Sequence, residues 1–275
     1  MVRILDGRKL SIKMGNSLKR KVKKLSLNLR LAVVQVGKDP ASDIFIRQKK
    51  KFCQKVGIDF KLYQFDRKLS VSKIKESIRK VSRDSRNSGV IIQLPLPKKI
   101  NPQEVLNLIL PKKDIDVLSE VSLGKFYQGT SPILPPIVCG ILRLLSFYKI
   151  NLKGKNVVIM GAGRLVGNPL TLQLLQEKAT VSVLNEFTKD TLFFTRKADI
   201  VISGVGKQGL IKGNMLKKGV VVIDAGTTFR NNKIVGDVDF KSVSKKASYI
   251  TPVPGGVGPM TVACLIENLV RLSIK

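Results

Sequence analysis

The chain has 275 residues, of which 43% are apolar and 25% are charged, a composition typical of a globular protein with one or two domains. It carries 50 Lys+Arg against 19 Asp+Glu, a net charge of +31, and it has no histidine. The absence of histidine excludes a Ser-His-Asp triad, a Cys-His dyad and any histidine-ligated metal.

Cysteine usage and the N-terminus suggest where the protein resides. Cys53, Cys139 and Cys264 are too far apart for a CxxC metal or redox motif, so no metal is expected, and such sparse thiols fit a reducing compartment. The N-terminus is charged where a signal peptide needs an apolar segment, and no run reaches the roughly 18 apolar residues of a membrane helix. We therefore expect a cytoplasmic protein with no membrane partner.

The first half of the chain alternates predicted strands and helices. In chain order we expect a strand at 31–36, a helix at 42–56, a strand at 60–65, a helix at 71–81 and a strand at 89–94. Residues 101–104 (NPQE) are typical of a helix start, with Asn as N-cap, Pro at the first helical position and Glu at the third. A helix over 136–148 leads into the second half.

The second half shows the same alternation and adds a terminal helix. We expect strands at 156–161, 180–185, 199–204 and 219–226, a helix at 165–178, and a last helix ending at Leu272. Strands that alternate with helices are typical of parallel sheets. The predicted fold class is therefore α/β, with two α/β lobes.

The positive charge is concentrated in the N-terminal part: the first 100 residues hold 27 Lys+Arg and 7 Asp+Glu. Such a field attracts nucleic acid, an anionic membrane surface or a small polyanionic substrate. Lysine-rich residue usage on a solvated surface is the favoured explanation. Because the basic residues are not gathered in one arm and aromatic residues make up only 5%, a dedicated nucleic-acid domain is disfavoured.

One lysine of the 42–56 helix lies on its apolar side. At 100° per residue, Lys49 falls within the stripe formed by Phe45, Phe52 and Val56, whereas the other four basic residues point away. A lysine there either reaches back to water with its ammonium or is desolvated. A desolvated lysine has a lowered pKa and serves as a base near neutral pH.

A glycine-rich turn follows the predicted strand at 156–161. Residues 161–167 (GAGRLVG) have the spacing GxGxxxG, close to the GxGxxG of dinucleotide sites. Glycines there allow a tight turn and a close approach to a pyrophosphate at the helix N-terminus. The same turn also occurs as a simple strand–helix junction.

Glu186 lies 25 residues after Gly161, just past the second strand of this unit. An acidic residue there accepts hydrogen bonds from the ribose 2′-OH of NAD and repels the 2′-phosphate of NADP. An exposed loop carboxylate without a ligand is the alternative.

Four segments carry a resemblance to a known family. They are residues 251–261 (TPVPGGVGPMT), 89–97 (GVIIQLPLP), 113–116 (KDID) and 236–239 (GDVD). The chain resembles the bifunctional methylenetetrahydrofolate dehydrogenase/cyclohydrolase family over nearly its whole length.

The resemblance implies a fold, domains and partners. Residues 1–118, completed by the C-terminal helix 255–275, would form the catalytic, folate-binding domain, and 119–254 would form the Rossmann domain for NAD or NADP. It implies a folate substrate bound in the cleft between the domains, a homodimer, and no nucleic-acid partner.

The resemblance also assigns residues. Lys49 takes the place of the catalytic lysine, with Gln93 and Asp116 as polar partners. The substrate-binding positions are Ser42, Phe45, Ile92, Leu94, Pro254, Gly255, Gly256 and Val257. The cofactor-binding positions, taken together with the glycine turn and Glu186, are Gly161, Ala162, Gly163, Arg164, Val166, Gly167, Glu186 and Thr227.

The implied chemistry has two steps. A hydride moves from the methylene carbon of 5,10-methylenetetrahydrofolate to the nicotinamide, a step governed by proximity and orientation. Water then attacks the methenyl carbon to give 10-formyltetrahydrofolate. Lys49 would manage the protons, with Gln93 holding its amine and Asp116 anchoring the pterin.

The sequence departs from the family at several of these positions. Phe45 stands where Tyr is usual, which removes a hydroxyl near Lys49, and Val117 stands where Gly is usual. Ala162 and Gly163 replace Arg and Ser, and Asn185-Glu186 replace His and Ser. Because the Arg and the second Ser contact the 2′-phosphate of NADP in the family, we predict that NAD is preferred; Arg164 turned toward the adenosine would oppose this.

Three alternatives stay open at this point. Loss of the Tyr hydroxyl would leave a monofunctional dehydrogenase. A basic nucleic-acid-binding protein on a retired enzyme scaffold would explain the charge. Another Rossmann oxidoreductase would explain the glycine turn but not residues 251–261.

Overall fold

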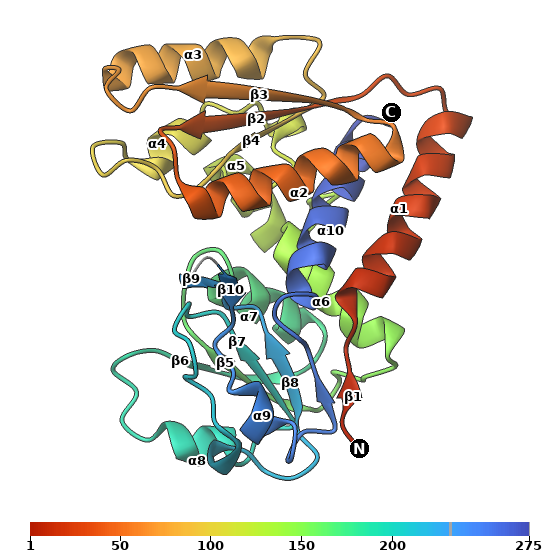
Figure 1. Ribbon diagram of the computed structural model, residues 1–275, viewed down its shortest axis with the longest axis vertical. Helices are drawn as coiled ribbons and strands as arrows, with labels where there is room; N and C mark the ends of the chain where they lie inside the picture. Colours follow the sequence, from red (N-terminus) through yellow and green to blue (C-terminus); the bar gives the residue numbers. More distant parts are fainter. Residues whose placement is uncertain (231–232, 275) are drawn as a thin grey trace. The chain divides into compact units, whose positions relative to one another are not determined.

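The computed structural model describes residues 1–230 and 233–274, and it divides into two compact units (Figure 1). One unit, the three-stranded lobe, comprises Ile12–Pro136 and Val262–Lys275; the other, the six-stranded lobe, comprises Met1–Ser11 and Ile137–Thr261. The predicted domain limits, at 118/119 and 254/255, stay a prediction. Residues 231–232 of the predicted Rossmann domain and Lys275 of the predicted last helix lie outside the described residues.

The three-stranded lobe is built on a parallel sheet in the order β3-β2-β4. Its elements are α1 (Gly7–Lys24, shared with the other lobe), β2 (Arg30–Val36), α2 (Pro40–Val56), β3 (Asp59–Phe65), α3 (Val71–Arg83), β4 (Gly89–Ile92), α4 (Pro102–Leu106), a 3₁₀ turn (Pro111–Lys113), α5 (Glu120–Tyr127) and the last part of α10 (Val257–Leu272). The parallel arrangement predicted from the alternating pattern is confirmed.

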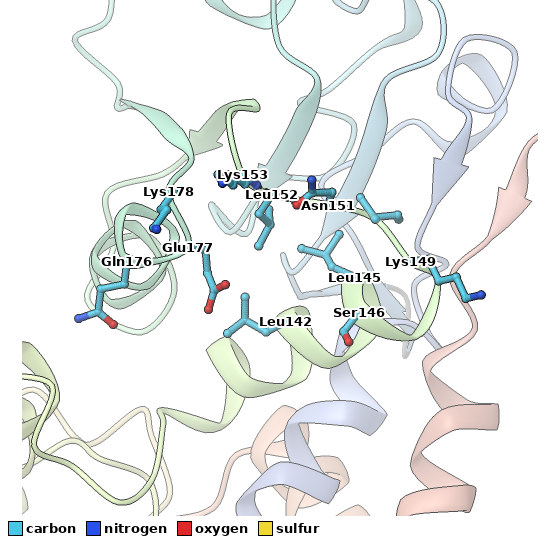
Figure 2. Close-up of a pocket in the computed structure, with 11 residues that line it drawn as sticks. Leu142, Leu145, Ser146, Lys149, Asn151, Leu152, Lys153, Gln176, Glu177 and Lys178 are labelled. Atoms are coloured by element: carbon cyan, nitrogen blue, oxygen red, sulfur yellow. Dashed lines mark hydrogen bonds between the residues drawn. The ribbon is translucent and has the colours of Figure 1, made fainter.

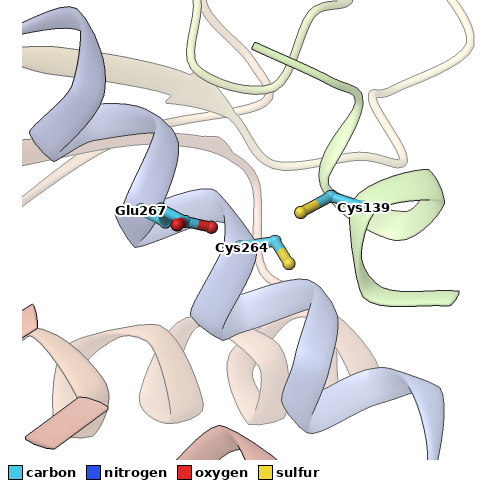
Figure 3. A group of neighbouring side chains, drawn as sticks. All are labelled: Cys139, Cys264 and Glu267. Carbon is cyan, nitrogen blue, oxygen red and sulfur yellow. The ribbon is translucent and has the colours of Figure 1, made fainter. Parts of the chain in front are cut away.

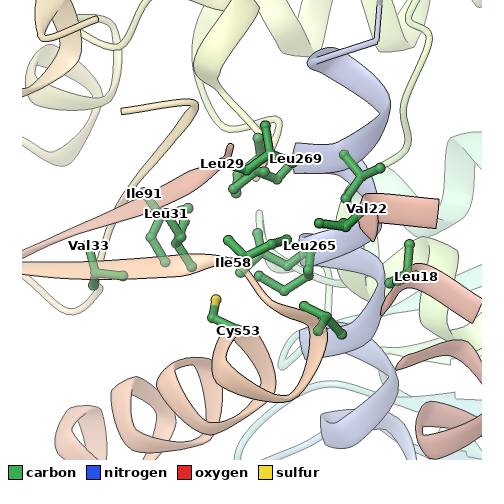
Figure 4. Close-up of a cluster of buried hydrophobic side chains, with 14 of the residues drawn as sticks. Leu18, Val22, Leu29, Leu31, Val33, Cys53, Ile58, Ile91, Leu265 and Leu269 are labelled. Atoms are coloured by element: carbon green, nitrogen blue, oxygen red, sulfur yellow. The ribbon is translucent and has the colours of Figure 1, made fainter. Parts of the chain in front are cut away.

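Two apolar cores cover the faces of this sheet. On one face, β2 side chains pack with α1, α2 and the C-terminal helix α10, as Leu18, Leu31, Cys53, Leu265 and Leu269 show in Figure 4. On the other face, alternate β2 residues pack against α3. The period of two in the strand therefore sends successive residues to opposite cores.

Helix ends in this lobe follow the local sequence. The Asp39 carboxylate accepts a hydrogen bond from the Ser42 amide at 2.8 Å and caps α2, which ends at Gly57 with φ 80°. Asn101 caps α4 by accepting from the Gln103 amide, with Pro102 in the first turn, as predicted. The predicted strand at 89–94 is shorter than expected: it ends at Ile92, and a cis Leu94–Pro95 bond follows.

The six-stranded lobe has a parallel sheet in the order β1-β11-β8-β7-β5-β6. Its elements are β1 (Arg3–Ile4), α6 (Pro136–Phe147), β5 (Asn156–Met160), α7 (Gly167–Gln176), β6 (Thr180–Leu184), α8 (Thr191–Thr195), β7 (Ile200–Ser203), a 3₁₀ turn (Gly213–Met215), β8 (Val221–Asp224), the β9 (Thr228–Arg230)–β10 (Lys233–Val235) ribbon, α9 (Phe240–Val243), β11 (Tyr249–Ile250) and the start of α10. The strand order reverses between β5 and β7. In open α/β sheets, ligands bind at the carboxyl ends of the strands at such a point.

Helix α1 and strands β1 and β11 were not predicted from the sequence. Helix α1 was not expected, although Leu10, Met14, Leu18 and Val22 recur at a helical spacing of four. Strands β1 and β11 have two residues each, too few for a periodic signal, and they exist through their pairing with each other and with β8.

None of the three cysteines takes part in a disulfide. Cys139 lies on α6, and Cys264 and Glu267 lie one turn apart on α10 (Figure 3). Among the described residues, no helix is long and apolar enough to span a bilayer.

Candidate active site and cofactor site

Lys49 lies on the inner side of α2, as the helical spacing predicted. Its side chain is half-buried, whereas Arg47, Lys50, Lys51 and Lys55 are exposed. Burial lowers the pKa of Lys49 below its ordinary value, and the Asp116 carboxylate opposes part of that effect. Lys49 is therefore the one basic residue of this helix whose amine is desolvated.

Gln93 holds the Lys49 amine. The Lys49 Nζ donates a hydrogen bond to Gln93 Oε1 at 2.8 Å, and Gln93 Nε2 donates to the Leu94 carbonyl at 2.8 Å. Gln93 is 8% exposed, so its amide has few alternatives to these partners. The pair spans 44 residues of sequence and forms because β4 ends beside α2.

Asp116 completes the polar group. Burial raises the pKa of Asp116 to about 6, against the attraction of the Lys49 ammonium. Asp114, two residues before, is fully buried and accepts from the Ser119 amide at 2.9 Å and the Ser119 hydroxyl at 2.6 Å. The structure thus places the three predicted catalytic residues in one lobe, with Lys49 electrostatically coupled to Asp116.

Val117 follows Asp116 in a left-handed conformation, with φ 58°. Glycine adopts this conformation freely, whereas a β-branched residue does so at a steric cost. The turn that presents Asp116 therefore has the backbone geometry of a glycine position, although it carries a fully buried valine.

The predicted substrate-binding residues fall in both lobes. In the three-stranded lobe, Ser42 and Ile92 are buried, Phe45 and Leu94 are half-buried, and the Ser42 hydroxyl donates to the Leu94 carbonyl at 3.4 Å. Residues 254–257 lie in the six-stranded lobe: 254–256 form the turn that leads into α10, and Val257 is the first residue of that helix.

Sequence reasoning missed the residue that fixes this turn. Gly7 approaches it so closely that a Cβ atom would lie 1.8 Å from the Gly256 carbonyl oxygen, and the Arg8 amide donates to the Gly255 carbonyl at 2.9 Å. The Asp6-Gly7 pair at the start of a basic helix carries no sequence signal for a contact with Gly255 and Gly256.

The glycine turn after β5 has the geometry of a dinucleotide site. Gly161 has φ 104°, and a Cβ atom on Gly167 would lie 1.9 Å from the Gly161 carbonyl oxygen. Ala162, Gly163 and Arg164 are exposed at the tip, while Val166 is buried. Both end glycines are thus required by the tightness of the turn.

The other predicted cofactor residues lie at the same edge of the sheet. Glu186 is exposed after β6, in a turn closed by the Thr188 amide donating to the Asn185 carbonyl at 3.2 Å. Thr227 is exposed after β8. Because β5, β6 and β8 run parallel in one sheet, their carboxyl ends bring these residues to one edge.

A surface cavity of about 650 Å³ lies elsewhere in the six-stranded lobe (Figure 2). Its lining includes Leu142, Leu145, Leu152, Lys153 and Glu177, from α6, the segment before β5 and the end of α7. None of the predicted site residues lines it. It lies toward the amino end of β5, whereas the predicted cofactor residues follow the carboxyl ends of the strands.

Comparisons with known proteins decide the family. A model of the tetrahydrofolate dehydrogenase/cyclohydrolase catalytic domain matches residues 5–116, and a model of the NAD(P)-binding domain of the same family matches residues 135–275. The chain belongs to the tetrahydrofolate dehydrogenase/cyclohydrolase family. The family and α/β fold predicted from the sequence are confirmed.

Relatives of this family match over nearly their full length. The chain is 43% identical over 274 residues to the Bifunctional protein FolD of Nitratiruptor, covering 98% of this chain and 97% of that one. It is 44% identical over 270 residues to the Bifunctional protein FolD of Helicobacter pylori, covering 96% and 93%.

Solved structures of members of this family are also similar to the chain. The bifunctional FolD enzyme of Campylobacter jejuni superposes with a TM-score of 0.94 at 40% identity, covering 99% of this chain and 98% of that one. A Trypanosoma brucei dehydrogenase–cyclohydrolase, complexed with NADP and an inhibitor, gives a TM-score of 0.94 at 31% identity, covering 98% and 97%. The chain is thus an enzyme of folate one-carbon metabolism with both family activities, and the monofunctional, nucleic-acid and other-oxidoreductase alternatives are not favoured.

Proposed function

We propose that the two activities of this dehydrogenase/cyclohydrolase draw on different groups of residues. The cyclohydrolase step depends on Lys49, Gln93 and Asp116 in the three-stranded lobe. The dehydrogenase step depends on the glycine turn and the other carboxyl-edge residues of the six-stranded lobe, where bound NAD(P) would accept the hydride of the methylene carbon. The observation that carries the proposal is the desolvated Lys49 amine, held by Gln93 at 2.8 Å.

Lys49 suits proton management during methenyl hydrolysis. Its lowered pKa makes the neutral amine available at a pH where an exposed lysine is fully charged. The neutral amine takes a proton from the attacking water, and the ammonium returns one as the ring opens. Gln93 keeps the amine in place, and its bond to the Leu94 carbonyl fixes the orientation of the amide.

Folate affinity is expected to fall as the pH drops through about 6. We propose that the Asp116 carboxylate anchors the pterin N–H groups, and its raised pKa of about 6 means that it is ionised above this pH and protonated below. The KM for the methenyl substrate should then rise about tenfold for each further pH unit. Asp116→Asn should bind more weakly with a flat profile, and a flat wild-type profile between pH 7 and 5 would contradict the assignment.

For the cofactor, we propose that NAD is preferred over NADP. The Glu186 carboxylate suits a ribose 2′-OH and repels a 2′-phosphate. Ala162 and Gly163, at the tip of the glycine turn, offer no side-chain cation to a phosphate. Arg164 is the residue of the turn that would favour NADP if its guanidinium faced the adenosine.

Glu186→Ser is expected to shift cofactor use toward NADP. Removing the carboxylate removes the repulsion of the 2′-phosphate and the acceptor for the 2′-OH, so the ratio of kcat/KM for NADP to that for NAD should rise roughly tenfold or more. Glu177→Ser, an exposed carboxylate at the end of α7, is the matched control and should leave the ratio unchanged. If Glu186→Ser does not raise kcat/KM for NADP, Glu186 does not determine the cofactor preference.

Initial rates test the proposed function directly. Purified protein would be given 5,10-methylenetetrahydrofolate with NAD or NADP, and acid-quenched samples would count methenyl product separately from reduced cofactor. Turnover favouring NAD supports the cofactor assignment. Turnover favouring NADP overturns that assignment while keeping the enzyme, and points to Arg164.

The proposal also includes the oligomeric state, the location in the cell and the limits of the domains, as expected from the family resemblance and the composition. We propose a homodimer and a cytoplasmic location, the latter supported by three cysteines that form no disulfide. We also propose that the functional domains are residues 1–118 with 255–275, and 119–254. Sedimentation of the purified enzyme tests the dimer.

A further inference from the structure

Asp237 is fully buried in the six-stranded lobe, and no described cation pairs with it. Its carboxylate instead accepts four hydrogen bonds from one segment. The donors are the Ser203 hydroxyl at 2.6 Å and the amides of Val205, Gly206 and Lys207 at 2.8, 3.2 and 2.7 Å. Three successive amides that converge on an anion form a nest, and here the chain supplies its own anion.

The segment that Asp237 holds, residues 203–207, begins at the last residue of β7, beside the point where the strand order reverses. It packs against the glycine turn. A Cβ atom on Gly161 would lie 3.0 Å from the Val205 side chain, and one on Gly204 would lie 2.6 Å from that of Val166. Any displacement of this loop therefore disturbs the turn.

A second carboxylate fixes Asp237 itself. Asp224, at the end of β8, accepts hydrogen bonds from the amides of Gly226, Asp237 and Val238 at 3.0, 3.1 and 2.9 Å. Burial raises the pKa of Asp224 to about 6, and the neighbouring Asp237 charge adds to the rise.

Two glycines make room for these carboxylates. A Cβ atom on Gly226 would lie 2.1 Å from the Asp237 carboxyl carbon, and one on Gly236 would lie 2.0 Å from an Asp224 oxygen. The segments after β8 and before α9 therefore pack closely together. The Asp237 carboxylate lies against Gly226, and the Asp224 carboxylate lies against Gly236. Such a fully satisfied polar network specifies one arrangement of its loops.

We infer that Asp237 is a positioning residue for the cofactor: it fixes the 203–207 loop against the glycine turn and so sets the shape of the dinucleotide site. The inference rests on the proposed cofactor site at 161–163. Asp237 touches no cofactor in this scheme and acts only through the loop. Its loss should weaken the cofactor step while sparing methenyl hydrolysis, whose proposed proton-transfer residues Lys49, Gln93 and Asp116 lie in the other lobe.

Asp237→Asn tests this in the full-length enzyme. The amide keeps the shape of the carboxylate, but an NH2 group replaces one acceptor oxygen and faces N–H or O–H donors, so the loop loses part of its anchor. The KM for the preferred cofactor should rise at least about tenfold. Methenyl hydrolysis, measured without cofactor, should stay within about twofold of wild type. Ser203→Ala, which removes one donor, should give a smaller rise in the same direction even if Asp237→Asn fails to fold.

Asp199→Asn is the matched control, because Asp199 immediately precedes β7, at the opposite end of the same strand, and accepts from the Asn156 amide at 2.9 Å. It should leave the cofactor KM unchanged. An unchanged cofactor KM in both Asp237→Asn and Ser203→Ala, with wild-type turnover intact, overturns the inference alone. A wild-type enzyme that uses neither NAD nor NADP overturns the proposed cofactor site and the inference with it.

Discussion

Lys49→Met is expected to reduce the rate of methenyl hydrolysis by about 10²–10⁴-fold, the usual contribution of a positioned acid–base group. Methionine has a similar length and is more easily desolvated, so the packing of α2 should persist. Hydride transfer should continue, because that step needs orientation rather than a proton carrier. Methenyl product, counted after acid quench, should therefore accumulate instead of passing on to the formyl product.

A second variant separates charge from proton transfer. Lys49→Arg keeps the positive charge beside Asp116 but cannot deprotonate, because guanidinium stays charged at any ordinary pH. It should lose hydrolysis as Lys49→Met does. Lys50→Met, on the exposed side of the same helix, is the control and should behave as wild type. Hydrolysis that survives both Lys49 variants, or that falls in step with hydride transfer, would remove Lys49 from the proposed role.

Gly167→Ala is expected to lower dehydrogenase kcat/KM by about 10²-fold through misplacement of the cofactor. The added Cβ atom would lie 1.9 Å from the Gly161 carbonyl oxygen, a backbone atom that no side-chain rotation can move away. The turn must open, and the N-terminus of α7 moves away from its place beside β5. Rates at varied cofactor concentration measure the effect.

The control for this variant is Gly124→Ala in α5. A Cβ atom on Gly124 meets no atom within 4 Å, so this substitution tests the exchange of glycine for alanine without a clash. It should leave both activities unchanged. Gly167→Ala should also keep methenyl hydrolysis, since Lys49 and its partners lie in the other lobe. Equal loss of both activities would indicate a folding defect instead.

The sequence predicted those structural features that depend only on neighbouring residues within one helix or strand. The position of Lys49 on the inner side of α2 follows from the 3.6-residue period alone, and the start of α4 follows from Asn101 and Pro102. The longer strands of both sheets follow from short apolar runs bounded by Gly, Pro or charged residues, whereas the two-residue strands β1 and β11 do not. Helix α1 was within reach by the same rule, since its apolar residues recur every four positions beneath a basic surface.

The glycine motif and the family resemblance predicted more of the site residues than helical or strand periodicity did. The spacing of the glycine turn indicated a dinucleotide site, and the structure explains why it needs Gly161 and Gly167: one has a positive φ and the other has no room for a Cβ atom. The family pattern also noted Val117 as a departure, and its φ of 58° gives the steric reason why glycine suits that position.

By itself, then, the sequence determined the fold class, the family and the types of residue in each site, because helical and strand periods, turn residues and motifs are local properties. Only the tertiary structure decided which distant groups meet: Lys49 with Gln93, Gly7 with Gly256, and Asp237 with the loop after β7. The physical reason is that these pairs are separated by tens to hundreds of residues. Their burial, hydrogen bonds and pKa shifts arise only when each lobe packs around its own sheet and brings them into contact.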